Sequence, residues 1–247
     1  MKQLVILAVF AAVFAATPLL AQKQQCYVVE NNGAQTKALS IKADANGTLE
    51  IVIKKDTPPV KRPRGQYRYA VIPRPPQVER YVKLFEDRNY GDMLKAAPGL
   101  YTATRYVGWG DLIAAYQSEA LLDQGKVEEA RQALKQAQAA PGANKDAVLH
   151  ANVRLLVHDK KFADVENLLK QLMTSKEDKT AAFAFNTRGQ VLAAQGQKRE
   201  AVLEYLKTLL LFDGKKTRAE RAEAKRQAVA LMTELKDPRV SKIKEMD

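Results

Sequence analysis

The spacing of hydrophobic side chains changes once along this chain, near residue 76. Before that point apolar and polar residues alternate, as in Leu49-Glu50-Ile51, and a period of two is typical of strands that bury one face. After it, apolar residues recur at three- and four-residue intervals, as in amphipathic helices. We therefore expect a small β module in residues 22–75, followed by a helical domain in residues 76–247.

Four stretches of the first region predict a three- or four-stranded antiparallel sheet. Asn46-Gly47 separates two of them, and a glycine that can adopt positive φ favours a two-residue hairpin turn there. The proline-rich segment 54–65 predicts an extended, exposed loop. A core of about 50 residues is marginal without a disulfide or metal, so we expect the module to dock on the helices. The expected strands are residues 26–30, 37–43, 48–54 and 66–72.

The helical region contains a repeated unit. Three stretches share one pattern, in which a turn residue is followed at fixed intervals by residues of the same kind: 124–134, 159–169 and 195–206. The turn residues Gly125, Lys160 and Gly196 lie about 35 residues apart, which is the period of stacked helix hairpins.

A degenerate copy of the unit precedes these three. One helix is expected from Gln77, and residues 87–89 form a turn. A second helix is expected from Tyr90, with Pro98-Gly99 interrupting it because proline removes a backbone donor.

The end of the chain predicts a capping helix. Residues 217–235 are polar around most of the helix circumference, as a terminal helix requires, and Asp237-Pro238 ends the helix before a loose basic tail. The expected fold is therefore mainly α, with about four antiparallel helix pairs and a capping helix after the β module.

The N-terminal segment has the pattern of a secretory signal peptide. Residues 1–21 contain one lysine followed by an unbroken apolar run, with cleavage expected after Ala21. The alternative is an uncleaved anchor, because the run approaches the length that spans a bilayer. Either interpretation predicts export, to the periplasm or cell envelope. The single cysteine, Cys26, excludes an internal disulfide and leaves only pairing between chains or no role.

The positive charge is concentrated in one segment. The formal net charge is +12, and residues 54–74 contain seven Lys and Arg residues against Asp56 alone. A basic stripe indicates a polyanionic partner, but export makes nucleic acid an unexpected one and favours anionic lipid, cell-wall polymer or an acidic protein. The alternative is a solvated loop. The candidate basic surface comprises Lys61, Arg62, Arg64, Arg68 and Arg74.

The repeated unit resembles the tetratricopeptide repeat family over residues 76–215. The best copy is 182–215, in which the family's small, large and turn positions are occupied by Gly189, Leu192, Gly196, Ala201 and Tyr205. Several positions depart from the family: no copy has the early tryptophan, Gln117 and Arg188 stand where leucine is usual, and Lys160 replaces a turn glycine.

The resemblance implies a right-handed superhelix with a concave groove lined by the first helix of each pair. Arg154 would lie there between two histidines, and an arginine fork suits a carboxylate-bearing ligand. Protonation of the histidines would strengthen binding near pH 5.5. The alternative is an ordinary solvated helix face. The candidate groove residues are Glu119, Asp123, His150, Arg154, His158, Asn186 and Gln190.

Nothing in the sequence indicates catalysis, a metal or a cofactor. Motifs such as GxGxxG, HExxH, CxxC and GxSxG are absent. The two histidines are eight residues apart on one expected helix, hence about 12 Å apart along its axis, too far to share a metal ion. We therefore expect a non-catalytic adaptor that binds a protein or peptide partner in the groove. The alternative is a protein that attaches to an anionic envelope surface through its basic segment.

Overall fold

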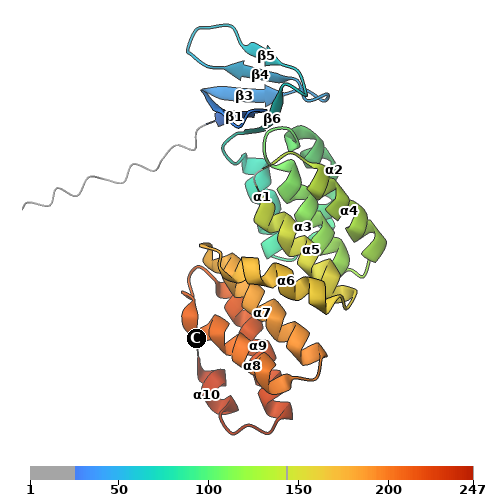
Figure 1. The fold of residues 1–247 in the computed structure, drawn as a ribbon, viewed down its shortest axis with the longest axis vertical. Helices are drawn as coiled ribbons and strands as arrows, with labels where there is room; N and C mark the ends of the chain where they lie inside the picture. The colour runs from blue at the N-terminus through green and yellow to red at the C-terminus, as the bar shows by residue number, and fades with distance from the viewer. Residues whose placement is uncertain (1–25, 143, 247) are drawn as a thin grey trace, which may run out of the picture.

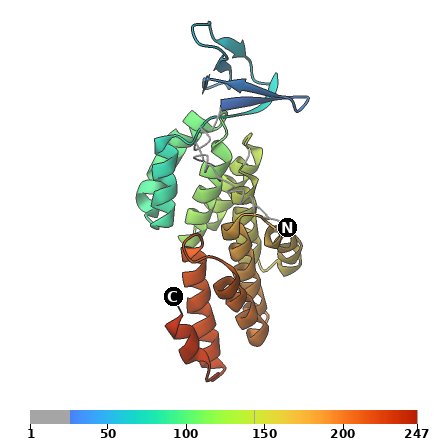
Figure 2. The same cartoon turned by 90° about the vertical axis from the view of Figure 1, so that its left-hand side faces the viewer.

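The computed structural model describes residues 26–142 and 144–246, and shows a β module at one end of an elongated stack of helices (Figure 1). Figure 2 shows the module and the last two helices at opposite ends of the molecule. The predicted signal peptide, residues 1–21, lies outside the described residues. Within those residues, no helix combines the length and apolarity needed to cross a membrane.

The β module consists of two three-stranded antiparallel sheets rather than one. The first has the order β2-β1-β6 and the second β3-β4-β5. Apolar residues of both sheets pack in one core around Val28, Leu49 and Tyr67. The strands are β1 (Cys26–Glu30), β2 (Gln35–Ala38), β3 (Ser40–Ala43), β4 (Leu49–Val52), β5 (Val60–Arg62) and β6 (Tyr67–Val71).

The division into two sheets occurs at Leu39. The sequence predicted one strand over residues 37–43, with Leu39 and Ile41 on the same buried face, but only Ile41 is buried and Leu39 is 61% exposed. The chain leaves β1 and joins β4 at this residue, since Leu39 N donates to Val52 O at 2.7 Å. A strand that changes sheets at a corner turns its side chains, so alternation fails there.

Two further predictions for the module are corrected. The proline-rich segment is not wholly a loop, because β5 pairs with β4 and places Val60 opposite Ile51. The turn containing Gly47 is wider than two residues: Asp44 N donates to Thr48 O at 3.0 Å, and Gly47 has φ +84°. The Asp44 carboxylate also accepts from two backbone N–H groups of the loop, which stabilises this conformation.

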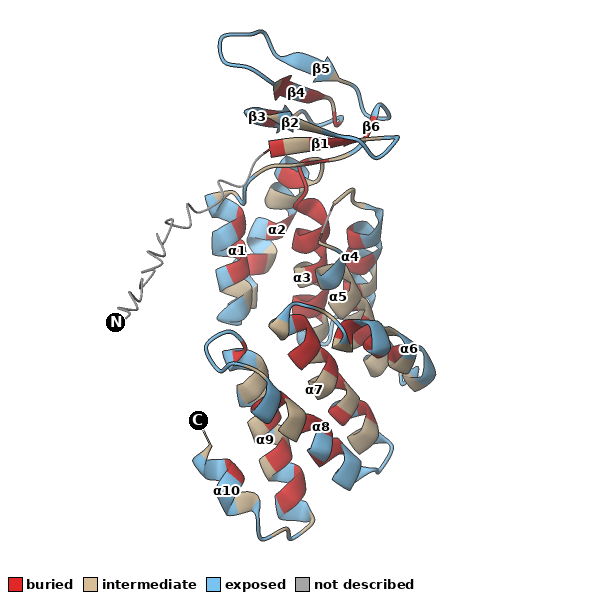
Figure 3. Ribbon diagram, turned by 60° about the vertical axis from the view of Figure 1, so that its left-hand side comes forward, coloured by how far each residue is buried: buried red, intermediate tan, exposed pale blue. Residues whose placement is uncertain are grey.

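Ten helices follow among the described residues, arranged as five consecutive pairs. Figure 3 shows their buried positions facing neighbouring helices, and α3 is buried along most of its length. The helices are α1 (Pro76–Glu86), α2 (Tyr90–Thr104), α3 (Gly110–Asp123), α4 (Val127–Ala139), α5 (Lys145–His158), α6 (Phe162–Met173), α7 (Asp178–Ala194), α8 (Lys198–Leu211), α9 (Arg218–Glu234) and α10 (Val240–Glu245).

All five pairs are joined by the same turn. In each, one residue adopts positive φ, and the next residue's N–H bonds to a carbonyl five positions earlier, at 2.8 or 2.9 Å. This is the Schellman arrangement, which satisfies the carbonyls left open at a helix end. The positive-φ residues are Arg88, Gly125, Lys160, Gly196 and Lys236.

Two helix boundaries differ from prediction. α2 continues through Pro98 to Thr104, because Met93 and Ala97, both fully buried, hold it against the first helical core. The expected loose tail instead forms α10, whose Ile243 is buried against α8 and α9. The stack therefore has five helix pairs, where about four and a capping helix were expected.

The module docks on the helices through the connection between α2 and α3. Val107 belongs to the module's core, and Trp109 Nε1 donates to Ile72 O at 3.1 Å. Gly108, at φ +91°, lies so close to the module that a Cβ atom there would be 2.8 Å from Ala70 O. Arg105 Nη2 adds a hydrogen bond to Ala45 O at 2.7 Å. The expectation of docking is confirmed.

Candidate functional site

The seven candidate groove residues lie on α3, α5 and α7, the first helices of three consecutive pairs. We call these seven residues the first-helix face. Its centre is Arg154 of α5, whose Nη1 donates to Glu119 Oε2 of α3 at 3.0 Å and whose Nη2 donates to Asp123. Tyr90 OH of α2 also donates to Asp123, at 2.6 Å. The arginine fork that the sequence assigned to a ligand carboxylate is therefore occupied by two carboxylates of the protein itself.

Burial decides the electrostatics of this network. It raises the pKa of Glu119, and Arg154 only partly opposes that shift. Burial would lower the pKa of Arg154, but Glu119 and Asp123 raise it above its usual value. The guanidinium therefore stays charged, and its partners link α3 to α5.

His150 does not behave as the sequence predicted. Its ring stacks on Phe183 of α7 with centroids 4.1 Å apart, and its Nε2 is buried without a hydrogen-bond partner among the described residues. Burial lowers the pKa of His150 to about 4, with Asp146 opposing and Arg154 reinforcing the shift. The expectation that both histidines gain charge near pH 5.5 therefore does not hold for His150.

His158 lies at the exposed end of α5. Its Nδ1 is 3.3 Å from Asp159 Oδ1, and the same carboxylate accepts two hydrogen bonds from Arg131 of α4 at 2.6 and 2.8 Å. These bonds from Arg131 lower the pKa of Asp159 to about 2. His158 is thus accessible to a partner and lies next to a carboxylate that stays ionised.

The two candidates on α7 have different environments. Asn186 Nδ2 donates to Glu220 O of α9 at 2.8 Å, while its Oδ1 is buried without a partner among the described residues. Gln190, one helical turn further, is exposed. Asn186 therefore joins neighbouring pairs, and Gln190 is available for binding.

A longer contact connects distant pairs across the same face. Lys179 Nζ of α7 lies 3.4 Å from Glu86 Oε1 of α1, although 93 residues separate them in sequence. Both side chains are more than half exposed, so this ion pair contributes little stability. It shows that the stack curves and brings its first and fourth pairs together.

The basic candidates divide into two groups. Arg64 Nη1 donates to Tyr67 O at 2.8 Å and lies over the Tyr67 ring, while Arg74 pairs with Glu79 at 3.0 Å and lies over Trp109. These two arginines hold the module's last turn and the module–helix junction.

The other three basic candidates lie on strands β5 and β6. Lys61 and Arg62 are on β5, where Lys61 lies 3.9 Å from Glu50 with both side chains at least half exposed. Arg68, on β6, is exposed. None of the five candidates is buried, and Arg64 and Arg74 are exposed as well, so all five remain on the surface.

Cys26 is buried in the core of the β module. Burial raises the pKa of the Cys26 thiol, which packs in the module core and contacts Leu39 O. No group of three or more His, Cys, Asp or Glu side chains in the described part of the chain is arranged to hold a metal ion.

Sequence reasoning missed several residues that contact or adjoin the first-helix face. Tyr90 was assigned only as a helix start, and the charges on Glu86 and Lys179 drew no attention because their partners are far away in sequence. The available signal was that Tyr90 directly follows a turn and carries a hydroxyl group, which usually finds a hydrogen-bond partner when the ring is buried.

Comparison with known protein families, with curated proteins and with solved structures finds no match to this chain. Its function is therefore inferred from its own geometry.

Proposed function

We propose that this protein is an exported, non-catalytic adaptor that binds a protein or peptide partner through a tetratricopeptide-like stack. The observation that carries the proposal is the first-helix face, where side chains of consecutive pairs contact one another from α3 to α9. Stacked helix pairs of this kind provide extended binding surfaces.

Binding would use the exposed margin of that face rather than its centre. Arg154 is committed to Glu119 and Asp123, whereas His158 and Gln190 are open to solvent. A partner therefore meets a surface of mixed charge, on which polar contacts give specificity.

A photo-crosslinking amino acid at position 190 tests this proposal. We expect Gln190 replaced in this way to crosslink one partner protein in the native envelope fraction, while a crosslinker at exposed Gln138 on α4 does not. The same crosslinked product in equal yield from positions 190 and 138 would contradict a specific role for the first-helix face.

The second candidate function is attachment to an anionic envelope surface through the β module. Lys61, Arg62 and Arg68 on the module's surface favour it. Binding of the full chain to anionic vesicles should then weaken steeply with salt. The triple change Lys61→Gln, Arg62→Gln and Arg68→Gln should abolish it, and vesicle binding that survives this change would exclude the module as the attachment site.

Export is tested separately. The segment 1–21 has the charge and apolar pattern of a signal peptide, and intact-mass measurement of the mature protein should give a chain that begins near Gln22. A retained Met1 would contradict cleavage.

A further inference from the structure

Helix α8 carries an apolar stripe on its outer side. Leu203 is 58% exposed and Leu210 is 68% exposed, with Leu206 half-buried between them. Their spacing of three and four residues places them on one helix face. We call these three residues the α8 stripe.

The stripe is not a requirement of the repeated unit. Helices α2, α4, α6 and α8 occupy the same place in their pairs, and the positions that match the stripe are surface positions in the other three. None of these positions carries a leucine: they are Lys95, Pro98 and Thr102 in α2, Gln132, Lys135 and Ala139 in α4, and Asn167, Lys170 and Thr174 in α6 and at its C-cap. Leu206 also packs against the core that α8 shares with α9 and α10, but packing does not explain the exposed Leu203 and Leu210.

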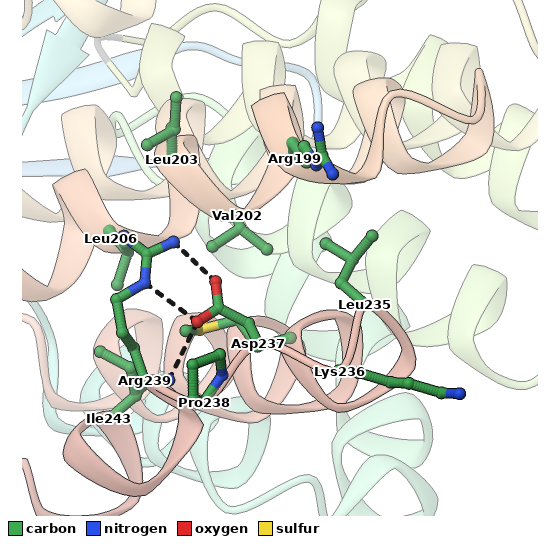
Figure 4. Close-up of a pocket in the computed structure, with 11 residues that line it drawn as sticks. Arg199, Val202, Leu203, Leu206, Leu235, Lys236, Asp237, Pro238, Arg239 and Ile243 are labelled. Carbon is green, nitrogen blue, oxygen red and sulfur yellow. Dashed lines mark hydrogen bonds and ion pairs between the residues drawn. The ribbon is translucent and has the colours of Figure 1, made fainter.

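Hollows border the stripe on both sides. One of about 550 Å³ lies between α8 and the α9–α10 end, with Met232, Leu235 and Ile243 among its lining residues (Figure 4). The other, of about 610 Å³, lies against α7 and includes Leu192 and Leu211. Leu203 and Leu206 line both hollows, so the stripe forms a ridge with a depression on each flank.

The charges beside the first hollow are mainly positive. Arg199, Lys236 and Arg239 line it against one carboxylate, Asp237, which Arg239 neutralises at 2.6 Å. Within the described residues, exposed Arg199 and Lys236 have no ion-pair partner among the bonds the structure shows. The second hollow is balanced, since Arg188 and Lys207 face Glu200 and Glu204. The flank toward α10 therefore attracts negative charge.

We propose that the α8 stripe is a second binding surface, which takes an amphipathic helix of a partner protein with leucine-type residues on one face and acidic residues along the edge that meets Arg199 and Lys236. An apolar ridge between two hollows suits the helix-in-groove mode, in which side chains at helical spacing enter the depressions. The surface is separate from the first-helix face and does not depend on what binds there.

Charge argues against a second copy of this chain as the occupant. The chain carries a net charge of +12, so two copies brought together at this cationic flank would repel each other, whereas an acidic helix is attracted.

The test uses a phage-displayed library of amphipathic helices with leucines fixed on one face and Glu, Asp, Lys, Arg or Gln varied along both edges. Peptides are selected for binding to the full chain, and those that also bind the double variant Leu203→Gln, Leu210→Gln are removed by counter-selection. These leucines are exposed, so the variant is expected to keep its fold, which its helical circular dichroism verifies. Lys135→Gln, at the position on α4 that matches Leu206, is the matched control.

We expect enriched peptides to be acidic along one edge. Their affinity, measured by fluorescence anisotropy, should fall about tenfold or more in the double leucine variant, as for the central residues of an interface, and stay unchanged in Lys135→Gln. The variant Arg199→Glu, Lys236→Glu should prefer peptides with lysine at that edge.

Four results would overturn the proposal. They are enrichment of neutral or basic edges, equal binding by the double leucine variant, a concentration-dependent dimer that the leucine changes abolish, and binding to anionic vesicles that the same changes abolish. The last two would assign the stripe to a second copy or to a membrane. None of these results bears on crosslinking at position 190, so failure here is distinguishable from failure of the adaptor function.

Discussion

The β module and the helical stack achieve stability in different ways. The stack repeats one local solution five times, a tight turn with one residue at positive φ and a hydrogen bond back to the preceding helix. The module depends on contacts between residues far apart in sequence: Leu39 at the corner between its sheets, β5 from the proline-rich segment, and Val107 from the helical region. Local order can be inferred from neighbours in the chain, whereas long-range order cannot.

The sharpest test of this difference is Tyr67→Ala. Tyr67 is 1% exposed in the module core, and its OH donates to Gly47 O at 2.5 Å. We expect the free energy of unfolding to fall by about 3–5 kcal/mol, which is enough to unfold a marginal module while most of the stack remains folded. Hydrogen exchange should show strands β1, β4 and β6 unprotected and α5 to α9 unchanged.

The matched change Tyr67→Phe removes only the hydroxyl and should cost about 1 kcal/mol. Equal loss of protection in module and stack after Tyr67→Ala would show that they unfold as one unit, and the contrast drawn above would fail.

The second test concerns His150, in the stack. The pKa of His150 is about 4 in the folded protein, below the ordinary 6.5, so between these two values only the unfolded chain takes up the proton. The contribution of neutral His150 to the free energy of unfolding is therefore fully present above pH 6.5 and is lost as the pH falls toward 4. We expect wild type to lose about 3 kcal/mol more than His150→Phe between pH 7 and pH 4. Phenylalanine keeps the stack on Phe183, so urea denaturation at several pH values isolates the titration. Parallel curves for the two proteins would contradict this assignment.

The third test is Ala201→Leu. Ala201 is fully buried where α8 packs against its neighbours, and overpacking a tight helix crossing costs about 1–3 kcal/mol. The melting temperature should fall, while Ala230→Leu at an exposed position of α9 leaves it nearly unchanged. Similar melting temperatures for both variants would mean that α8 tolerates a larger residue than its packing suggests.

The smallest expected effect compares the turns themselves. Lys160 adopts φ +57°, a conformation in which glycine has no steric penalty. Lys160→Gly should therefore stabilise the protein by about 0.5–1 kcal/mol, whereas Lys170→Gly inside α6 should cost about 1 kcal/mol. Chemical denaturation shows whether each change raises or lowers the free energy of unfolding. Destabilisation by both changes would show that the contacts of the Lys160 side chain stabilise the fold by more than its backbone strain destabilises it.

Sequence reasoning located the stack well because its signals are local. The helix starts at Tyr90, Val127, Phe162 and Lys198 all follow a turn at a regular interval. It failed where a distant partner decides the outcome, as at Pro98, whose helix is kept by packing, and at Leu39, where alternation breaks at a corner.

The candidate site followed the same rule. Helical spacing placed Arg154 beside His150 and His158, but it could not show that Glu119 and Asp123 of another helix already occupy the guanidinium. Nor could it show that Phe183 covers His150 and shifts its titration. The pattern of one helix gives a face, and only the neighbouring helices determine what that face can bind.

The insertion of Val107 into the module core has a mechanical consequence. The covalent link between module and stack, Ile72 to Pro75, runs beside a second, non-covalent attachment made by Val107 and Trp109 at the start of α3. A pulling force on the module is therefore transmitted to the most deeply buried helix of the stack and not only along a proline-containing tether. The module would behave as a rigid body, so a force applied to it would act on the first helix pairs before the junction between module and stack breaks.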